Sequence, residues 1–378
     1  MADATPRALL LSIGSELLLG DTVDTNAAFL AGELARQGVE LLGVRQLPDD
    51  RPVIAAAFGE ARGLAEVVIA TGGLGPTHDD LTREGLADAL GEVLTPDPSL
   101  ESELRERFVA YGRMPKSNLR QAMLIPSAEA LANPIGSAPG WWVDRDGVVI
   151  VLLPGVPSEM HLMWSEQAVP RVEARFSLRP LHVRTVKTFG IGESAAAEAV
   201  GDLLEEPGDA VLAGIYARDD GVHLRFSTRG DPSLLDAPVA RALLALDEHV
   251  WGGDDDDLGT VALSALGAAG ARTVASWEAD TAGALLAILA AAASDAPAAR
   301  FVGGVLDAGG ATATPAADAV IQASLVPMDA HGRSRVRVSV SGIVTMPRSE
   351  LRIHGSGPQR LRRAAFAALD QVRRAFRS

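Results

Sequence analysis

The sequence predicts a protein of two or three α/β domains, and three observations lead to that prediction. The chain has 378 residues, which is too long for one ordinary hydrophobic core. Hydrophobic residues make up 47% of it, enough to fill several cores. Short apolar runs alternate with amphipathic helical patterns through the first half, which is typical of a parallel sheet covered by helices on both faces.

The first half repeats the order strand, helix, strand. The expected elements are a strand over 8–13, a helix from Asp24 or Thr25 to Gly38, a strand over 39–47, a helix from about Asp50 and a strand over 66–71. Parallel sheets hold their ligands at the carboxyl ends of the strands. The loops after these strands are therefore the expected site, and the apolar run 148–153, with its glycine-proline loop, is expected to add a fourth.

The second half changes in texture from about Leu181. Strand and helix patterns there predict a compact βαββα unit, and the acidic run Asp254–Asp257 suggests a solvated linker or helix start rather than a metal chelator. Helix, strand and helix patterns follow, ending in a basic amphipathic helix expected to pack on its own domain. The expected domains cover residues 1–172, 173–253 and 258–378.

Composition excludes several classes of function. The net charge is −15 and aromatic residues are 4%, so general binding of nucleic acid or an anionic membrane is not expected. Net charge governs long-range steering, which leaves room for a local basic pocket that holds a phosphate. With no cysteine, disulfides, thiolate zinc sites and cysteine nucleophiles are excluded, and no apolar run approaches the roughly 18 residues of a membrane span. We expect a cytoplasmic protein.

A glycine-rich loop after the third strand is the first candidate for chemistry. Gly72, Gly73 and Gly75 precede a helix pattern, so backbone N–H groups can face a phosphate. Asp79 and Asp80 close the loop. Adjacent carboxylates can hold a divalent cation or activate water, and the alternative of one helix cap and one solvated aspartate is equally open.

Other candidates flank this loop. Asp24 and Asn26 follow the first strand and can cap the next helix, whereas Glu16 at the same edge has no capping role and is available for chemistry. Lys116 and Arg120 are candidate anion partners or solvated helix charges. Trp141 and Trp142 are expected to fill a core edge, with one of the two facing outward.

Five segments of the chain share their order and spacing with one known family. They are IGSELLLGDTVDTNAAFLA, TGGLGPTHDDLTREGLA, MPKSNLRQA, SAPGWW and LLPGVPSEM. On these motifs the first 170 or so residues closely resemble the N-terminal half of the CinA (competence and damage-inducible) family, which is related to molybdopterin-binding domains. The βαββα unit resembles that family's KH-like connecting domain, with TFGIGES as its most recognisable piece.

The resemblance implies hydrolysis of the ADP-ribose pyrophosphate in a parallel-sheet, molybdopterin-binding-like domain. It implies a divalent cation (Mg, Co or Mn), a potassium ion and a nucleotide substrate. We also expect a homodimer, because the connecting and C-terminal domains carry apolar helices that need cover. Catalysis would then fall to Glu16, Asp79 and Asp80, with the two aspartates holding the metal. The residues that would bind the ligand are Gly14, Ser15, Asp24, Asn26, Gly72, Gly73, Gly75, Thr77 and Lys116. A non-catalytic adaptor that binds a pterin or nucleotide is the alternative.

The C-terminal α/β segment resembles the family's nicotinamide mononucleotide amidohydrolase domain but departs from it. The family's Ala-Glu-Ser-Cys-Thr-Gly-Gly turn here reads WEADTAG, with Ala279 at the serine position and Asp280 at the cysteine position. Alanine cannot form an acyl intermediate. GGVLDAGGATATPAAD lacks the family's tyrosine and lysine, and SGIVTMPRS keeps only Ser341, Gly342 and Ile343. We expect residues 258–378 to have lost deamidase activity and to serve packing or oligomer contacts; a residual amidohydrolase is the alternative.

Overall fold

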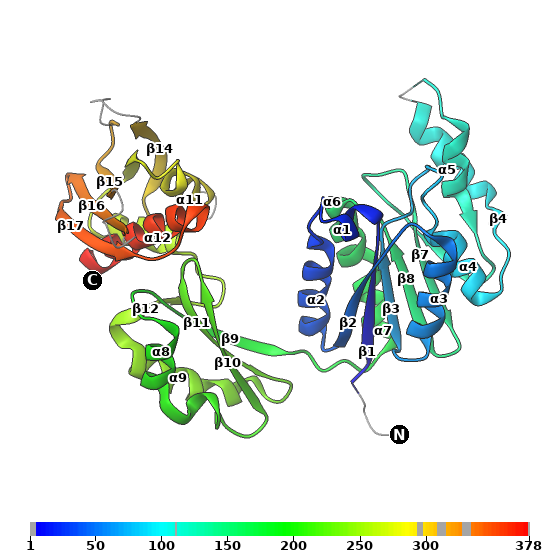
Figure 1. The fold of residues 1–378 in the computed structure, drawn as a ribbon, viewed down its shortest axis with the longest axis horizontal. Helices are drawn as coiled ribbons and strands as arrows, with labels where there is room; N and C mark the ends of the chain where they lie inside the picture. The colour runs from blue at the N-terminus through cyan, green and yellow to red at the C-terminus, as the bar shows by residue number, and fades with distance from the viewer. Residues whose placement is uncertain (1–4, 110–111, 293–297, 308–314, 327–333, 377–378) are drawn as a thin grey trace. The chain divides into compact units, whose positions relative to one another are not determined.

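The computed structural model describes residues 5–109, 112–292, 298–307, 315–326 and 334–376 (Figure 1). The chain forms two compact units, residues 1–181 and residues 182–378. In the described part of the chain, no helix is both long enough and apolar enough to cross a membrane.

A six-stranded sheet lies at the centre of the first unit, in the order β2-β1-β3-β8-β7-β6. The strands β2, β1, β3 and β8 pair in parallel, whereas β7 pairs antiparallel with β8 and β6 pairs antiparallel with β7. The strands are β1 (Arg7–Ile13), β2 (Glu40–Leu47), β3 (Val67–Thr71), β6 (Ala128–Leu131), β7 (Gly140–Arg145) and β8 (Val148–Leu153). The α/β class is confirmed, and because β8 pairs with β3 its following loop joins the edge where the ligand site was expected.

Helices cover both faces of this sheet. One face packs against α3 (Arg51–Arg62) and α4 (Thr82–Leu90), and the other against α2 (Thr25–Gln37), α6 (Pro157–Met163) and α7 (Val169–Arg175). The remaining elements are α1 (Ser15–Leu19), β4 (Thr95–Pro96), α5 (Pro98–Phe108), η2 (Lys116–Ala122), β5 (Met123–Leu124) and η3 (Trp164–Ala168).

Both tryptophans of the Trp141–Trp142 pair are buried, so the expectation that one faces outward is wrong. Trp141 packs in the cluster that contains α3 and α4, and Trp142 packs in the cluster on the opposite face. Alternate residues of a strand do point to opposite faces. In this sheet, however, both faces at β7 are covered.

Helix boundaries in the first unit follow the caps that the sequence predicts. Asp24 accepts the Ala27 N–H at 2.9 Å and begins α2, and Asp50 accepts the Val53 N–H at 3.1 Å and begins α3. Gly38 ends α2 with φ +87°, and a Cβ on it would meet the Arg179 carbonyl oxygen at 2.0 Å. Glycine is required there by both backbone conformation and space.

The second unit contains two sheets. The first has the order β10-β11-β9-β12 and packs against α8 and α9, and the second has the order β14-β13-β15-β16-β17. Elements of the first part are β9 (His182–Thr188), α8 (Glu193–Val200), η4 (Gly201–Leu204), β10 (Val211–Arg218), β11 (Gly221–Thr228), η5 (Pro232–Leu235), α9 (Asp236–Leu246), η6 (Asp247–His249) and β12 (Val250–Gly253). Those of the second part are α10 (Leu258–Ala268), β13 (Thr273–Ala279), α11 (Ala284–Ala292), β14 (Arg300–Asp307), β15 (Ala319–Val326), β16 (Ser334–Gly342), β17 (Met346–Ile353) and α12 (Gly357–Ala375).

The βαββα order is present, with β12 as an additional strand after the second helix. The acidic run beyond it forms a turn and a helix start. Asp257 caps α10 by accepting the Thr260 N–H at 2.8 Å, and Asp254 accepts the Thr185 N–H at 2.7 Å. The described residues after this run form five strands, four more than the helix, strand and helix pattern indicated.

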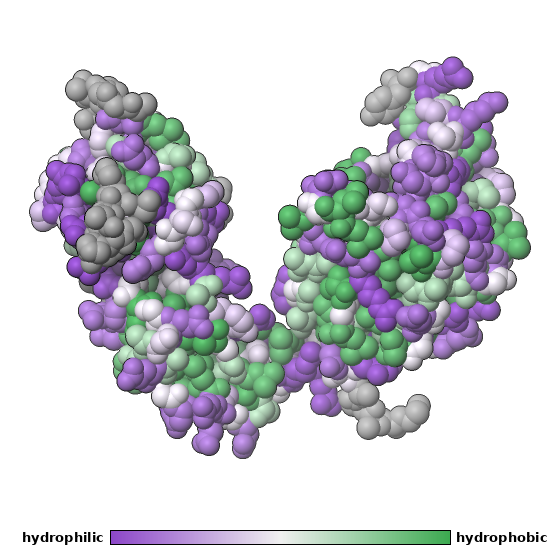
Figure 2. All heavy atoms as spheres, in the orientation of Figure 1, coloured by the Kyte–Doolittle hydropathy of each residue, from purple (hydrophilic) through white to green (hydrophobic). Residues whose placement is uncertain are grey.

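Helix α12 packs on its own part of the unit, with Ala365, Leu369 and Val372 fully buried, as its apolar stripe predicts. The unit boundary falls after Leu181, where the sequence pattern changes, and α7 ends before it at Arg175. The finer division into residues 1–172, 173–253 and 258–378 stays a prediction. Large apolar side chains remain exposed in both units, and Figure 2 shows hydrophobic residues on the visible face of each. Such surfaces suit the expected homodimer, which stays a prediction.

Candidate functional site

A cavity of about 490 Å³ opens at the carboxyl edge of the first unit's sheet. Loops after β1, β2, β3 and β8 line it, together with a few residues from the segment before β7. The polar and glycine residues of its lining are Gly14, Glu16, Thr22, Asp24, Thr25, Asn26, Asp49, Thr71, Gly72, Gly73, Gly75, Thr77, Asp79, Asp80, Gln121, Ser137, Gly155 and Glu159. The expected meeting of four strand ends therefore occurs.

The glycine loop after β3 packs tightly against the end of β1 and the start of α4. Gly72 has φ +94°, and a Cβ on it would lie 2.1 Å from the Ile13 carbonyl oxygen; Thr82 donates its hydroxyl to the Gly72 carbonyl at 2.8 Å. The N–H groups of Gly73 and Leu74 donate to no group among the described residues. The loop thus needs glycine for its own packing and still leaves two backbone donors for a ligand.

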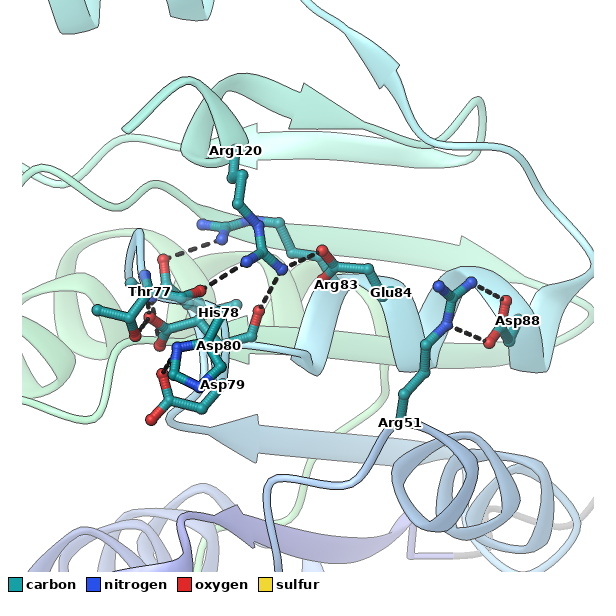
Figure 3. A network of polar contacts seen from close by, with 11 residues as sticks. Arg51, Thr77, His78, Asp79, Asp80, Arg83, Glu84, Asp88 and Arg120 are labelled. Atoms are coloured by element: carbon teal, nitrogen blue, oxygen red, sulfur yellow. Dashed lines mark hydrogen bonds and ion pairs between the residues drawn. The ribbon is translucent and has the colours of Figure 1, made fainter. Parts of the chain in front are cut away.

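Asp80 holds this loop closed (Figure 3). One carboxylate oxygen accepts the Gly75 N–H at 2.8 Å, and the other accepts the Thr77 N–H at 2.7 Å and the Thr77 hydroxyl at 2.5 Å. The helix that follows has Leu81 at its N-cap and no side-chain cap. Asp80 therefore connects Gly75 and Thr77 of its own loop, and we call this arrangement the Asp80 clasp. The structure does not show Asp80 capping the helix, and both of its oxygens accept hydrogen bonds.

Arginines support the same loop from outside the cavity. Arg120 donates to the carbonyl oxygens of Thr77 (2.6 Å) and Asp80 (3.1 Å) and pairs with Glu84 at 2.6 Å (Figure 3). Arg83 is buried and donates to the Leu74 carbonyl at 2.9 Å. Burial lowers the pKa of Arg83 to about 10, so it remains charged at neutral pH.

Asp79, the other acid of the pair, is exposed and points away from the clasp (Figure 3). The pKa of its carboxyl is lowered, mainly by the neighbouring Thr77 side chain and its own backbone N–H, with smaller contributions from His78 and Arg120. It is therefore ionised at neutral pH and available to a cation.

The loop after β1 presents oxygen atoms without partners. Asp24 uses Oδ1 as the cap of α2, while its buried Oδ2 has no partner; Asn26 donates Nδ2 to the Gly155 carbonyl at 2.8 Å, while its buried Oδ1 has none. Glu16 is exposed on the short helix α1. Buried oxygens without donors are costly, so their presence in a cavity wall points to a ligand or cation.

The lining carries six carboxylates, and no lysine or arginine contributes to it from the described residues. In that part of the chain no three acidic or histidine side chains come together as a complete metal cage. Magnesium is commonly held by one or two carboxylates plus substrate phosphates, so the lining fits a cation that arrives with or is completed by a phosphorylated ligand.

Most of the residues expected at the site from the sequence line this cavity, whereas Ser15, Lys116 and Arg120 do not. Ser15 donates its N–H (2.9 Å) and hydroxyl (2.8 Å) to Asp49, which ties the first two loops together. Lys116 is exposed outside the lining. The sequence-based prediction missed Asp49, Gln121 and Glu159 as individual lining residues, although the strand-end rule had marked the loops of Asp49 and Glu159.

Family models match two parts of the chain. Residues 9–174 match the "Probable molybdopterin binding domain" and residues 183–243 match the "Damage-inducible protein CinA KH domain". A CinA-like protein of Thermomicrobium roseum is 47% identical over 270 residues, covering 70% of this chain and 66% of that protein. One of Deinococcus deserti is 44% identical over 290 residues, covering 75% and 70%.

The chain belongs to the CinA-like family. Among solved structures, the protein CinA of Thermoplasma acidophilum is 33% identical, with a TM-score of 0.42 over 44% of this chain and 98% of that one. The match spans about two thirds of the length of the first curated relatives. In this CinA-like chain the molybdopterin-binding-like domain contains the whole cavity, and the KH domain begins the second unit.

The C-terminal segment forms a tight turn between β13 and α11, at the WEADTAG sequence. Asp280 and Ala282 have φ of +59° and +51°, which non-glycine residues rarely adopt. Buried Glu278 accepts the Thr281 hydroxyl at 2.7 Å and the N–H groups of Leu285 and Leu286, at the start of α11. The Thr281 hydroxyl is thus already engaged. The segment after Asp307, up to residue 314, lies outside the described residues.

Proposed function

We propose that the first unit hydrolyses the pyrophosphate bond of ADP-ribose, giving AMP and ribose 5-phosphate, with a divalent cation. The observation that carries this proposal is the cavity lining: six carboxylates, two free backbone donors and no basic side chain among the described residues. A diphosphate alone would be repelled by such a lining. A diphosphate carrying a divalent cation would complement it.

Asp24 and Asn26 each keep a buried oxygen without a partner, and the exposed carboxylate of Asp79, 3.8 Å from His78 Nδ1, can join them in holding a cation. A bound cation would neutralise phosphate charge and polarise the phosphorus centre. Asp80 would act through the loop, since its oxygens already accept three hydrogen bonds. This assigns metal contact to Asp79 and loop positioning to Asp80.

Glu16 would take the proton of the attacking water. It lines the cavity, is exposed, and accepts no side-chain hydrogen bond within the described chain. Water oxygen would bond to phosphorus while the bridging P–O bond breaks and the leaving phosphate keeps its electron pair. The free N–H groups of Gly73 and Leu74 can hold a non-bridging oxygen as charge builds up on it.

A second candidate is a non-catalytic adaptor that binds a pterin or a nucleotide in the same cavity. The match of residues 9–174 to a probable molybdopterin-binding domain favours it. The two functions differ in turnover. Hydrolysis needs a divalent cation and releases two products, whereas an adaptor binds its ligand and releases none.

The test is to incubate the purified full chain with ADP-ribose, with and without Mg, Mn or Co, and to measure AMP and ribose 5-phosphate by chromatography. Parallel titration with molybdopterin follows binding alone. Metal-dependent release of both products supports hydrolysis. Tight pterin binding without any turnover of ADP-ribose would overturn it in favour of the adaptor.

For the C-terminal segment we propose that deamidase activity is lost. Ala279 supplies no hydroxyl, and the Thr281 hydroxyl is buried and donated to Glu278. No lysine follows Lys187 in the sequence to serve as a base. The tight turn then serves the start of α11 rather than a nucleophile.

A further inference from the structure

A second cavity of about 390 Å³ lies wholly within the second unit, where the KH part meets β17 and α12. Its walls come from the loop before α8, the β10–β11 turn, the end of β17 and the first turns of α12. The charged residues of the lining are Glu193, Arg218, Asp219, Arg352, His354 and Arg363. The proposed hydrolysis uses none of them.

Positive charge predominates in this lining. Arg352 and His354 are exposed and form no ion pair within the described chain, and Arg363 makes only a long contact of 3.4 Å to the His354 carbonyl oxygen. Of the two acids, Asp219 is already paired with Arg362 at 3.1 Å. Three arginines thus face one unpaired carboxylate, in a chain whose net charge is −15.

Cations of like sign repel one another, so their collection in one cavity costs free energy unless an anion joins them. Arg218 lies 5.9 Å from the Tyr216 ring, which steadies its guanidinium without neutralising it. The loop Gly190–Gly192 forms another wall, with Gly190 at φ +79°, and it leads into α8 with no side-chain cap. These features add backbone donors to the arginine cluster.

We propose that this cavity binds a small phosphate ester or diphosphate, held mainly by Arg352, Arg363 and Arg218. Arginine matches phosphate oxygens with paired N–H donors, which favours phosphate over a simple carboxylate. The volume lies in the range of small-molecule sites and exceeds the size of one inorganic phosphate. The strongly acidic chain is poor in aromatic residues, which favours a small metabolite over a nucleic acid as the ligand of this cavity.

The proposal gives the second sheet and α12 of the second unit a role that does not depend on the lost deamidase. Arg352 and Arg363 come from that part, whereas Arg218 and the glycine loop come from the KH part. A ligand between them would stabilise the arrangement of the two parts within the unit.

The experiment titrates the full chain, free of divalent metal, with inorganic pyrophosphate and with AMP by calorimetry. Arg352→Gln should weaken binding of the preferred probe by about tenfold or more, as expected for loss of one arginine–phosphate contact. Arg348→Gln is the matched control, because Arg348 is exposed on the same strand and outside the lining. It should leave binding unchanged, and neither variant should alter ADP-ribose turnover.

Absence of binding by both probes, or binding that Arg352→Gln and Arg363→Gln leave intact, would overturn the proposal. A single-stranded RNA that binds more tightly than either probe, and loses affinity in Arg352→Gln, would replace the metabolite with nucleic acid. Because turnover in the first unit is measured separately, failure of this proposal and failure of the proposed hydrolysis give different results.

Discussion

Two loops of this molecule each follow a strand and each contain a motif acid, yet they differ in what they leave free. In the loop 72–80, Asp80 accepts three hydrogen bonds from its own loop, and the cavity beside it keeps free donors and oxygens. In the turn 278–283, Glu278 accepts three hydrogen bonds too, and one of them takes up the Thr281 hydroxyl.

In both loops the motif acid shapes the backbone, so an acid can be retained for the shape of a loop and not for its chemistry. Both carboxylates satisfy backbone donors that would otherwise be unpaired. The two loops differ in the side chains around them: Glu16 and Asp79 line the first cavity, whereas Ala279, beside Glu278, has no group that could act as a nucleophile. Matching a motif therefore predicts a loop more securely than it predicts a reaction.

The largest effect should come from Glu16→Gln. Loss of the proposed base should lower ADP-ribose turnover by about 100-fold or more, because general-base catalysis typically contributes at least that factor. The melting temperature should stay nearly unchanged, since Glu16 is exposed. Asp21→Asn, in the same loop and outside the lining, is the control and should retain turnover. A large loss of stability with normal turnover per folded molecule would assign Glu16 to structure.

Asp80→Asn should lower both stability and turnover, the latter less than Glu16→Gln does. The asparagine NH₂ group would replace one of the two carboxylate oxygens that accept hydrogen bonds from the loop. The loss should lower the free energy of unfolding by about 1–3 kcal/mol. Urea unfolding measures this change, and metal titration of the surviving activity shows whether the cation still binds. Normal stability together with a strongly raised metal requirement would identify Asp80 as a metal ligand instead of a clasp.

Glu278→Gln should affect stability alone. The buried carboxylate would lose an acceptor for the Thr281 hydroxyl or for the start of α11, again about 1–3 kcal/mol. ADP-ribose turnover should match that of the unchanged chain, because Glu278 lies in the other unit. A drop in turnover as large as that of Asp80→Asn would contradict a purely structural role of Glu278, because it would link this turn to the first cavity.

The smallest effect is expected for Ala279→Ser. Ammonia release from nicotinamide mononucleotide should be absent in the original chain and should stay absent in the variant, since the family's tyrosine and lysine are also missing. A family member with an intact Ala-Glu-Ser-Cys-Thr-Gly-Gly turn provides the positive control. Release at a comparable rate by the original chain would contradict the proposed loss.

The sequence was sufficient for elements whose signals are local. Asp24, Asp50 and Gly38 act within one helical turn, so the ends of these helices could be predicted to within a residue or so. The two tryptophans could not be placed, because burial of both depends on helices far away in the chain. β12 was missed for a similar reason: it is only four residues long and is defined by its pairing with β9.

The site was predictable as a set of loops and less so as a set of contacts. Parallel strands bring their carboxyl ends to one edge whatever the side chains are, so the cavity's position followed from strand order. Ser15 could not be assigned, because its partner Asp49 lies on another loop. The contacts of Asp80 with Gly75 and Thr77 could not be predicted, because they depend on how the loop folds back on itself, and metal binding by Asp80 stays a prediction.

The position of helix α12 late in the chain affects the order in which the two units can fold during synthesis. It fills the core of the second unit, where its residues pack against α10, α11 and the sheet, and its Arg373 reaches back to the Val250 carbonyl at 2.9 Å. Every partner of this helix leaves the ribosome before it does. The first unit can therefore fold during synthesis, whereas the second keeps an apolar sheet face uncovered until α12 emerges. That interval is when chaperones would have their main opportunity to bind this chain.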